Sequence, residues 1–255
     1  MNNPWTREET IIAFNVFCKI PFKNSAKTHP LIIEYARLIG RTPSALNMKV
    51  GNLGRLDPSL RAQGISGLTH GAKMEEEVWN EFAHDPERLA YESERLIAQF
   101  AHQNIEQTAH IDTDNLPEGR ERERVVRQRV NQSFFRAAVM SAYNFKCCIS
   151  GVANADVVEA AHIVDWADSV AQRTNPQNGL CLNAFFHKAY DRNLVGITPD
   201  GDICVSDALL DSAKEPDFRA YLQTLRGRRI LSPEKFLPNP DFLAAHYEHY
   251  QRRWN

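Results

Sequence analysis

Long hydrophobic runs are absent from this sequence of 255 residues. A membrane-spanning helix needs roughly 18 to 20 consecutive apolar residues, and no stretch of the chain approaches that length. The first residues, MNNPWTREE, lack the charged and apolar regions of a secretory signal. The five cysteines are an odd, scattered set without repeated Cys-x-x-Cys spacing, which argues against a disulfide scaffold. We therefore expect a cytoplasmic protein that does not contact a membrane.

A large net charge is also absent, because the chain carries only −2 at pH 7. Its 43% hydrophobic and 24% charged residues are typical of a folded globular protein. The charge is nevertheless unevenly distributed. Residues 1–73, 119–150 and 218–255 carry +6, +5 and +4, whereas residues 74–118 and 151–217 carry −10 and −7. Since a polyanion senses charge within a Debye length of about 8 Å, nucleic acid stays among the expected partners, although each block also fits a solvated helix face.

The N-terminal part of the chain is expected to be helical. Thr6 precedes Glu9 by three residues and stands before an apolar run, which predicts a capped helix that ends at Pro21. A second helix is expected over residues 30–40, between a proline and a glycine. A longer acidic helix is expected over residues 75–103 and should pack against this bundle.

A third N-terminal helix is expected to begin after Thr42, with Pro43 at its first position. Two short helices joined by a glycine-containing turn have the layout of a helix-turn-helix, and the opening WTREE resembles the Myb-like group of DNA-binding domains over residues 4–56. This resemblance implies that Arg41 contacts nucleic acid. The alternative is a helical bundle used for packing or dimerisation.

The fold class we expect is α+β, with an all-helical domain followed by a mixed domain. Residues 105–119 are polar, show no sustained periodicity and include Pro117 and Gly119, so we interpret them as a linker between residues 1–104 and 120–255. The second domain should contain a basic helix over 120–143, strands over 157–164 and 179–183, a short helix over 184–193, a hairpin that turns at Asp200-Gly201, and a helical tail.

Polar residues with metal and acid–base chemistry are concentrated between residues 146 and 191. His162 lies in an apolar strand, Asn178 precedes the next strand, and His187 and Asp191 are four residues apart. Residues at i and i+4 share a helix face, so His187 and Asp191 can point at one site. An imidazole and a carboxylate suit a divalent cation that keeps open positions for substrate.

His162, Asn178 and His187, at the spacing H-x15-N-x8-H, resemble the three name residues of the HNH endonucleases. The motifs EAAHI, NPQNGLCL and FFHKAYD extend this resemblance, which covers roughly residues 128–206 and points to the branch common among bacterial restriction-type nucleases. It implies a ββα-metal fold in the second domain, followed by a helical tail, and hydrolysis of DNA. It also implies that His162 is the general base, that Asn178 holds the loop orienting it, and that His187 binds the metal.

Each of these residues also has a structural interpretation. His162 is alternatively a core histidine bonded to a backbone carbonyl, Asn178 an ordinary Asn-Gly turn residue, and Asp191 a solvated residue on the helix surface. The cysteines are expected to be small core residues, and no structural zinc is predicted.

One position departs from the family pattern. Many HNH enzymes place a metal ligand immediately before the general base, where this chain has Ala161. Strand alternation puts Glu159 on the same side as Ala161, so Glu159 or Asp191 is expected to complete the metal site with His187. Glu159 alternatively supports a ligand through a hydrogen bond. The expected cofactor is Mg²⁺ or Mn²⁺, with Ni²⁺ or Zn²⁺ as alternatives.

The expected partner is double-stranded DNA, contacted by arginines of the basic helix that include Arg127 and Arg136; for Arg136 an internal ion pair is the alternative. We expect a role in restriction or phage defence. A catalytically silent DNA-binding regulator is the alternative that Ala161 keeps open, and RNA is a less favoured substrate. A homodimer suits double-strand cleavage of a palindrome, and a nicking monomer fits equally well.

Overall fold

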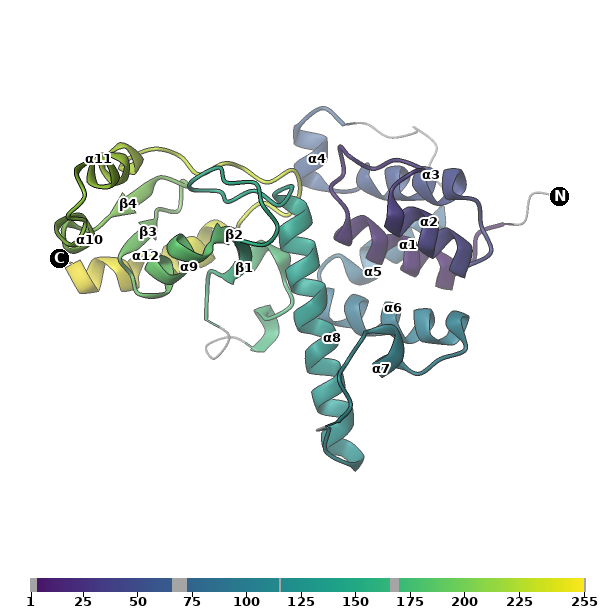
Figure 1. Ribbon diagram of the computed structural model, residues 1–255. Coiled ribbons are helices and arrows are strands. Elements are labelled where there is room, and N and C mark those ends of the chain that lie inside the picture. The colour runs from purple at the N-terminus through teal and green to yellow at the C-terminus, as the bar shows by residue number, and fades with distance from the viewer. Residues whose placement is uncertain (1–3, 66–72, 115, 166–169, 255) are drawn as a thin grey trace.

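A long helix, α8 (Gly119–Ala142), stands between two groups of elements in the computed structural model (Figure 1). The structure describes residues 4–65, 73–114, 116–165 and 170–254. Helices α1 to α7 lie on one side of α8, and the strands with the remaining helices lie on the other. The first turns of α8 extend beyond both groups. The arrangement confirms the expected α+β class, with helices first and a mixed region after them.

The N-terminal helices begin where the capping signals predict. In the first of them, the Thr6 side chain accepts a hydrogen bond from the backbone of Glu9, and the Glu9 carboxylate accepts one from the backbone of Thr6. This exchange satisfies backbone N–H groups that the first helical turn leaves unpaired. The N-terminal helices are α1 (Arg7–Lys19), α2 (Pro30–Leu38), α3 (Pro43–Gly54), α4 (Pro58–Ala62), α5 (Lys73–Phe82), α6 (Pro86–Ala101) and α7 (Ile105–Thr108).

One of the sequence expectations needs correction here. The acidic segment expected as one helix over 75–103 forms two, α5 and α6, because Asp85 caps a new helix and Pro86 occupies its first position. The segment expected to be a linker contains the short helix α7, capped by Asn104. The division of the chain into domains stays a prediction.

Helix α8 contributes to two apolar cores with its opposite sides. Val126, Val130 and Phe134 belong to the core of the N-terminal helices. Phe135 and Val139 belong to the core of the strands and C-terminal helices. All five side chains are buried, so α8 fixes the two groups of elements to each other.

A two-stranded antiparallel ribbon in the second group of elements carries His162, and Asn178 and His187 flank its second strand in the sequence. Strands β1 (Val158–His162) and β2 (Gly179–Asn183) pair with His162 opposite Gly179. One face of the ribbon packs on α8. A Cβ atom on Gly179 would clash with Cγ2 of Val139, so glycine is what allows this close approach. The other face packs on α9 (Ala184–Asp191), which follows β2 directly.

The remaining elements build the outer part of this second group. The expected hairpin is present, with a positive φ of 90° at Gly201. The remaining elements are the short 3-10 helices η1 (Val170–Gln172) and η2 (Pro176–Asn178), strands β3 (Val195–Ile197) and β4 (Ile203–Val205), and helices α10 (Asp207–Ser212), α11 (Pro216–Leu225) and α12 (Pro240–Trp254). None of the helices in the described ranges is long and apolar enough to cross a membrane.

Candidate active site

His162 is the last residue of β1, on the face of the ribbon that packs against α8. Its imidazole stacks on the ring of Phe135, with centroids 3.9 Å apart and an interplanar angle of 5°. Its Nε2 lies 2.9 Å from the carbonyl oxygen of Arg173. A carbonyl only accepts hydrogen bonds, so Nε2 carries the proton and the neutral ring has its lone pair on Nδ1.

The environment of His162 favours the neutral imidazole. Burial lowers the pKa of His162 below its ordinary value of 6.5, because the charged form loses hydration. The Arg173 carbonyl and the carboxylate of Asp165 oppose this effect, whereas the charge of His187 adds to it. The two imidazoles project from different faces of the ribbon, since His162 packs on α8 and His187 belongs to α9.

Asn178 holds the segment that follows β1. Its Oδ1 accepts a hydrogen bond from the backbone N–H of Val164 at 2.8 Å. Its Nδ2 donates to the carbonyl oxygens of Val164, at 3.2 Å, and Gln172, at 3.3 Å. The residue is 1% exposed. The side chain therefore joins the two ends of the connection between β1 and β2, and His162 lies at the first of them.

His187 lies between two carboxylates on the opposite face of the ribbon. Its Nδ1 is 2.5 Å from Oε2 of Glu159, and its Nε2 is 3.7 Å from Oδ1 of Asp191. Glu159 reaches it because alternate residues of β1 share a face, and Asp191 because it lies one helical turn further on α9. The three side chains that the sequence motif singles out for a metal are thus adjacent, and both carboxylates are about half exposed.

This arrangement fits a divalent cation held by two protein groups and water. Nε2 of His187 faces the Asp191 carboxylate, whereas Glu159 occupies the other ring nitrogen. Among the described residues, no group of three or more His, Cys, Asp or Glu side chains is positioned to hold a metal ion. Ala161, at the position of the usual family ligand, is fully buried. Mg²⁺ commonly keeps several waters and few protein ligands, so a two-residue set suits it.

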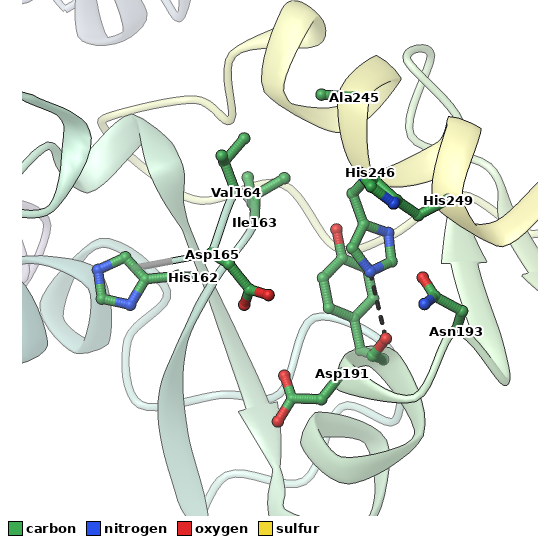
Figure 2. A pocket seen from close by; sticks show the side chains of 10 residues that line it. His162, Ile163, Val164, Asp165, Asp191, Asn193, Ala245, His246 and His249 are labelled. Atoms are coloured by element: carbon green, nitrogen blue, oxygen red, sulfur yellow. Dashed lines mark hydrogen bonds between the residues drawn. The ribbon is translucent and has the colours of Figure 1, made fainter. Parts of the chain in front are cut away.

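A cavity of about 100 Å³ opens beside these residues (Figure 2). The carboxylates of Asp165 and Asp191 face it from the segment after β1 and from the end of α9, and His246 and His249 of α12 form the opposite wall. His162 also lines the cavity, but its imidazole lies on the far side of the chain from Asp191 in this view. The cavity therefore lies between the end of β1 and the end of α9.

The residues that α12 contributes were missed at the level of sequence. His246 stacks on Tyr190, with centroids 3.6 Å apart, and its Nε2 lies 3.2 Å from the Tyr190 carbonyl oxygen. Burial lowers the pKa of His246 to about 4. A signal was present, because His246 and His249 are three residues apart and share a helix face, but nothing local connects that face to α9.

The three arginines expected to contact nucleic acid have different surroundings. Arg41 is bound to Glu9 at 2.7 Å and lies over the ring of Trp5, with its side chain 13% exposed; it is not brought to the site. Arg127 is exposed and lies over the ring of Tyr91, 4.0 Å from its centroid. Arg136 is exposed and forms no ion pair within the described part of the chain, so the expected alternative of an internal pair does not apply among these residues.

The cysteines lie in or beside the core of the second group of elements, apart from Cys18. Cys147, Cys148 and Cys181 are fully buried. Burial raises the pKa of the Cys148 thiol, so it stays protonated at neutral pH. They act as small apolar residues, as the sequence predicts.

Comparison with known families gives one match over this region. Residues 147–198 match the family model described as HNH endonuclease. No curated protein matches the chain. The matched segment contains β1, β2, α9 and β3 and all five residues expected at the catalytic and metal positions, whereas α8 and α12 lie outside it. Residues 147–198 of this chain therefore form a segment that matches the HNH endonuclease family.

Proposed function

We propose that this protein is a metal-dependent HNH endonuclease that hydrolyses phosphodiester bonds of double-stranded DNA. The observation that carries the proposal is the position of His187 between Glu159 and Asp191, on the face of the ribbon opposite to His162. An imidazole with a carboxylate on each nitrogen fits a metal ligand, and a neutral imidazole nearby fits a general base.

His162 acts as the general base in this proposal. The imidazole takes a proton from water through Nδ1 while Nε2–H stays bonded to the Arg173 carbonyl, which fixes the tautomer. The lowered pKa keeps the ring neutral at pH 7. Asn178 orients the ring indirectly by holding Val164 and Gln172. Water attacks phosphorus in line and leaves 5′-phosphate and 3′-hydroxyl ends.

His187 Nε2 and the Asp191 carboxylate would hold the cation, for which we propose Mg²⁺ or Mn²⁺; Ni²⁺ and Zn²⁺ also accept imidazole ligands. The chemistry supplied there is neutralisation of charge at the scissile phosphate and at the leaving 3′ oxygen. Glu159 accepts the Nδ1–H bond and fixes the orientation of the His187 ring.

We propose a role in restriction or phage defence, which the resemblance to restriction-type HNH proteins supports. Residues 1–104 would help to choose the DNA site as a helix-turn-helix domain, with residues 105–119 as a connection and 120–255 as the nuclease domain. The exposed side chains of Arg127 and Arg136 support contacts with the DNA backbone from α8. For Arg41 the ion pair with Glu9 supports a structural role instead.

A second candidate function follows from Ala161. Because this residue is fully buried and has no ligand atom, the chain offers fewer metal ligands than the usual family pattern. A DNA-binding regulator with a catalytically silent HNH fold would tolerate this loss.

Plasmid cleavage distinguishes the two functions. Supercoiled DNA, with and without base modification, is incubated with Mg²⁺, Mn²⁺ or Ni²⁺, and the wild type is compared with His162→Ala. EDTA-sensitive nicking that disappears in the variant is expected. DNA binding without metal-dependent nicking in any of these ions would establish the regulator.

Single-stranded RNA in parallel tests the substrate class, and sedimentation of the protein with DNA tests the homodimer.

A further inference from the structure

A basic groove lies against α8, on the side of the ribbon to which the His162 imidazole points. It has a volume of about 240 Å³ and is lined by Arg124, Arg127 and Asn131 of α8 and by Arg173 and Thr174 of the segment between η1 and η2. Glu87 at the start of α6 is the acidic residue of its lining. The α8 and α6 walls lie outside the family match, so this groove belongs to the particular chain rather than to the HNH motif.

The charges of the groove suit an anion. Among the described residues of its lining, three carry guanidinium groups and one, Glu87, carries a carboxylate. Arg124 is also paired with Glu121, 2.5 Å away on the exposed surface of α8, where such a pair is weak. The Arg127 guanidinium is held over the Tyr91 ring, which restricts its motion without neutralising its charge.

Two polar side chains of the groove are buried without a hydrogen-bond partner in the described part of the chain. They are Oγ1 of Thr174, in a residue 2% exposed, and Oδ1 of Asn131, in a residue 6% exposed. Such atoms are rare in folded proteins because each loses its hydration without compensation. The Thr174 hydroxyl can donate to an anion, and a flip of the Asn131 amide presents Nδ2 in the same way. Both therefore fit a ligand rich in acceptor oxygens.

The same segment that supplies Arg173 and Thr174 holds the proposed general base. The carbonyl oxygen of Arg173 bonds Nε2 of His162, and the carbonyl oxygen of the preceding residue, Gln172, bonds Asn178. A ligand on the Arg173 and Thr174 side chains would restrain the backbone that orients the imidazole. Binding in the groove and positioning of His162 are thus linked through one peptide segment.

We infer that this groove binds a backbone phosphate of duplex DNA next to the scissile phosphate, and that the bound phosphate fixes the segment that positions His162. The inference rests on the proposed function and adds the path of the DNA strand. In this inference the DNA backbone runs from Asp191 of α9, past His162, to the arginines of α8. Arg173 and Thr174 are positioning residues, since they act through His162.

Binding is tested without cleavage, using the full chain in EDTA and a fluorescent DNA duplex whose anisotropy is read at several salt concentrations. Each lost phosphate contact should reduce the slope of log K against log salt by about 1. We expect this reduction for Arg127→Gln and Arg173→Gln. Arg129→Gln is the matched control, because Arg129 is exposed on the same helix and does not line the groove. Unchanged slopes for the first two variants, or an equal change in the control, overturn the inference.

Thr174→Val removes the hydroxyl and keeps the shape, and an unpartnered hydroxyl contributes no hydrogen bond to the fold. The variant should fold normally, as circular dichroism would verify, and bind DNA about tenfold more weakly, the size of a hydrogen bond to a charged group. Wild-type affinity for DNA in the folded variant would contradict phosphate binding in the groove. Tighter binding of an RNA duplex than of the DNA duplex contradicts DNA as the partner.

Cleavage separates this inference from the proposed function. Arg127→Gln should raise KM alone, whereas Thr174→Val and Arg173→Gln should also lower kcat because the segment holding His162 loses its restraint. If the variants show the expected salt slopes but the protein cuts no DNA, the proposed nuclease activity is refuted and phosphate binding in the groove is not. Normal cutting with unchanged slopes and unchanged kcat in all three variants would refute the groove alone.

Discussion

The Oε2 atom of Glu159 lies 2.5 Å from Nδ1 of His187, on the side of the ring away from Asp191. A carboxylate in this position accepts the Nδ1–H bond and leaves the lone pair on Nε2, which faces Asp191. Metal-binding histidines commonly donate their other N–H to a carboxylate in this way. Of the two roles open to Glu159, the geometry favours orientation of His187, and it favours Asp191 as the second ligand.

Charge-neutralising substitutions of the two carboxylates should therefore have different effects. For Glu159→Gln we expect the Mn²⁺ concentration at half-maximal cleavage to rise about 10- to 100-fold, with kcat largely restored at saturating metal ion. For Asp191→Asn we expect a loss that added metal ion does not restore. Plasmid nicking over a Mn²⁺ titration measures both. Asp200→Asn, on the hairpin turn, is the control: it changes the charge equally and should behave as wild type. If added Mn²⁺ restored cleavage by Asp191→Asn but not by Glu159→Gln, Glu159 would be the ligand.

Removal of the Asn178 amide should destabilise the protein and slow cleavage together. Asn178→Ala leaves the N–H and carbonyl of Val164 and the carbonyl of Gln172 without this partner. After relaxation we expect a decrease in the free energy of unfolding of about 2 to 4 kcal/mol, measured by urea denaturation. Gln177→Ala changes an exposed neighbour and should cost less than about 0.5 kcal/mol. Equal stabilities of the two variants would show that Asn178 is only a turn residue.

The local signals of the sequence predicted most elements because their causes are local. Thr6 and Glu9 cap α1 through a reciprocal bond three residues apart, and β2 has the bounds that were expected. The break between α5 and α6 was not predicted, although Asp85 and Pro86 are typical of the start of a helix. Apolar residues recur at helical spacing on both sides of the break, and this periodicity outweighed the local signal.

The site was predictable where its residues are related by strand or helix geometry. Alternation along β1 and the four-residue repeat of α9 bring Glu159 and Asp191 to His187. Contacts across the fold follow no such rule. The ion pair of Arg41 with Glu9 and the approach of His246 to Tyr190 depend on tertiary packing, which one sequence does not reveal.

Gly179 should be intolerant of even a methyl group. In Gly179→Ala the new Cβ meets Cγ2 of Val139, a stiff β-branched side chain of α8. We expect a loss of about 1 to 3 kcal/mol in the free energy of unfolding. Val139→Ala in the same chain should relieve the clash, so the double variant should be more stable than the sum of the single effects predicts. Simple additivity would show that the two residues do not meet.

The acid stability of the protein should depend on His246. Its folded pKa of about 4 lies below the ordinary 6.5, so between these values the unfolded chain binds a proton that the folded protein does not. Stability is therefore lost as the pH falls from 6.5 towards 4, by about 2 kcal/mol between pH 7 and 5. In His246→Gln this contribution disappears, and urea denaturation at both pH values should show a smaller decrease than in wild type. Parallel decreases would mean that His246 is not buried as a neutral ring.

The pH dependence of cleavage should report the neutral state of His162. Because burial lowers the pKa of this residue, the basic form persists below pH 6.5, and kcat/KM should fall with acid only at a midpoint below that value. Phe135→Ala removes the ring on which the imidazole stacks and admits water, so the pKa of His162 should rise and move the midpoint upward. Rates measured at saturating Mn²⁺ keep loss of the metal ion from setting the midpoint, and NMR titration of the His162 ring gives the pKa directly. A midpoint above 6.5 in the wild type, or one that Phe135→Ala leaves unchanged, would exclude His162 as the base whose protonation limits the reaction.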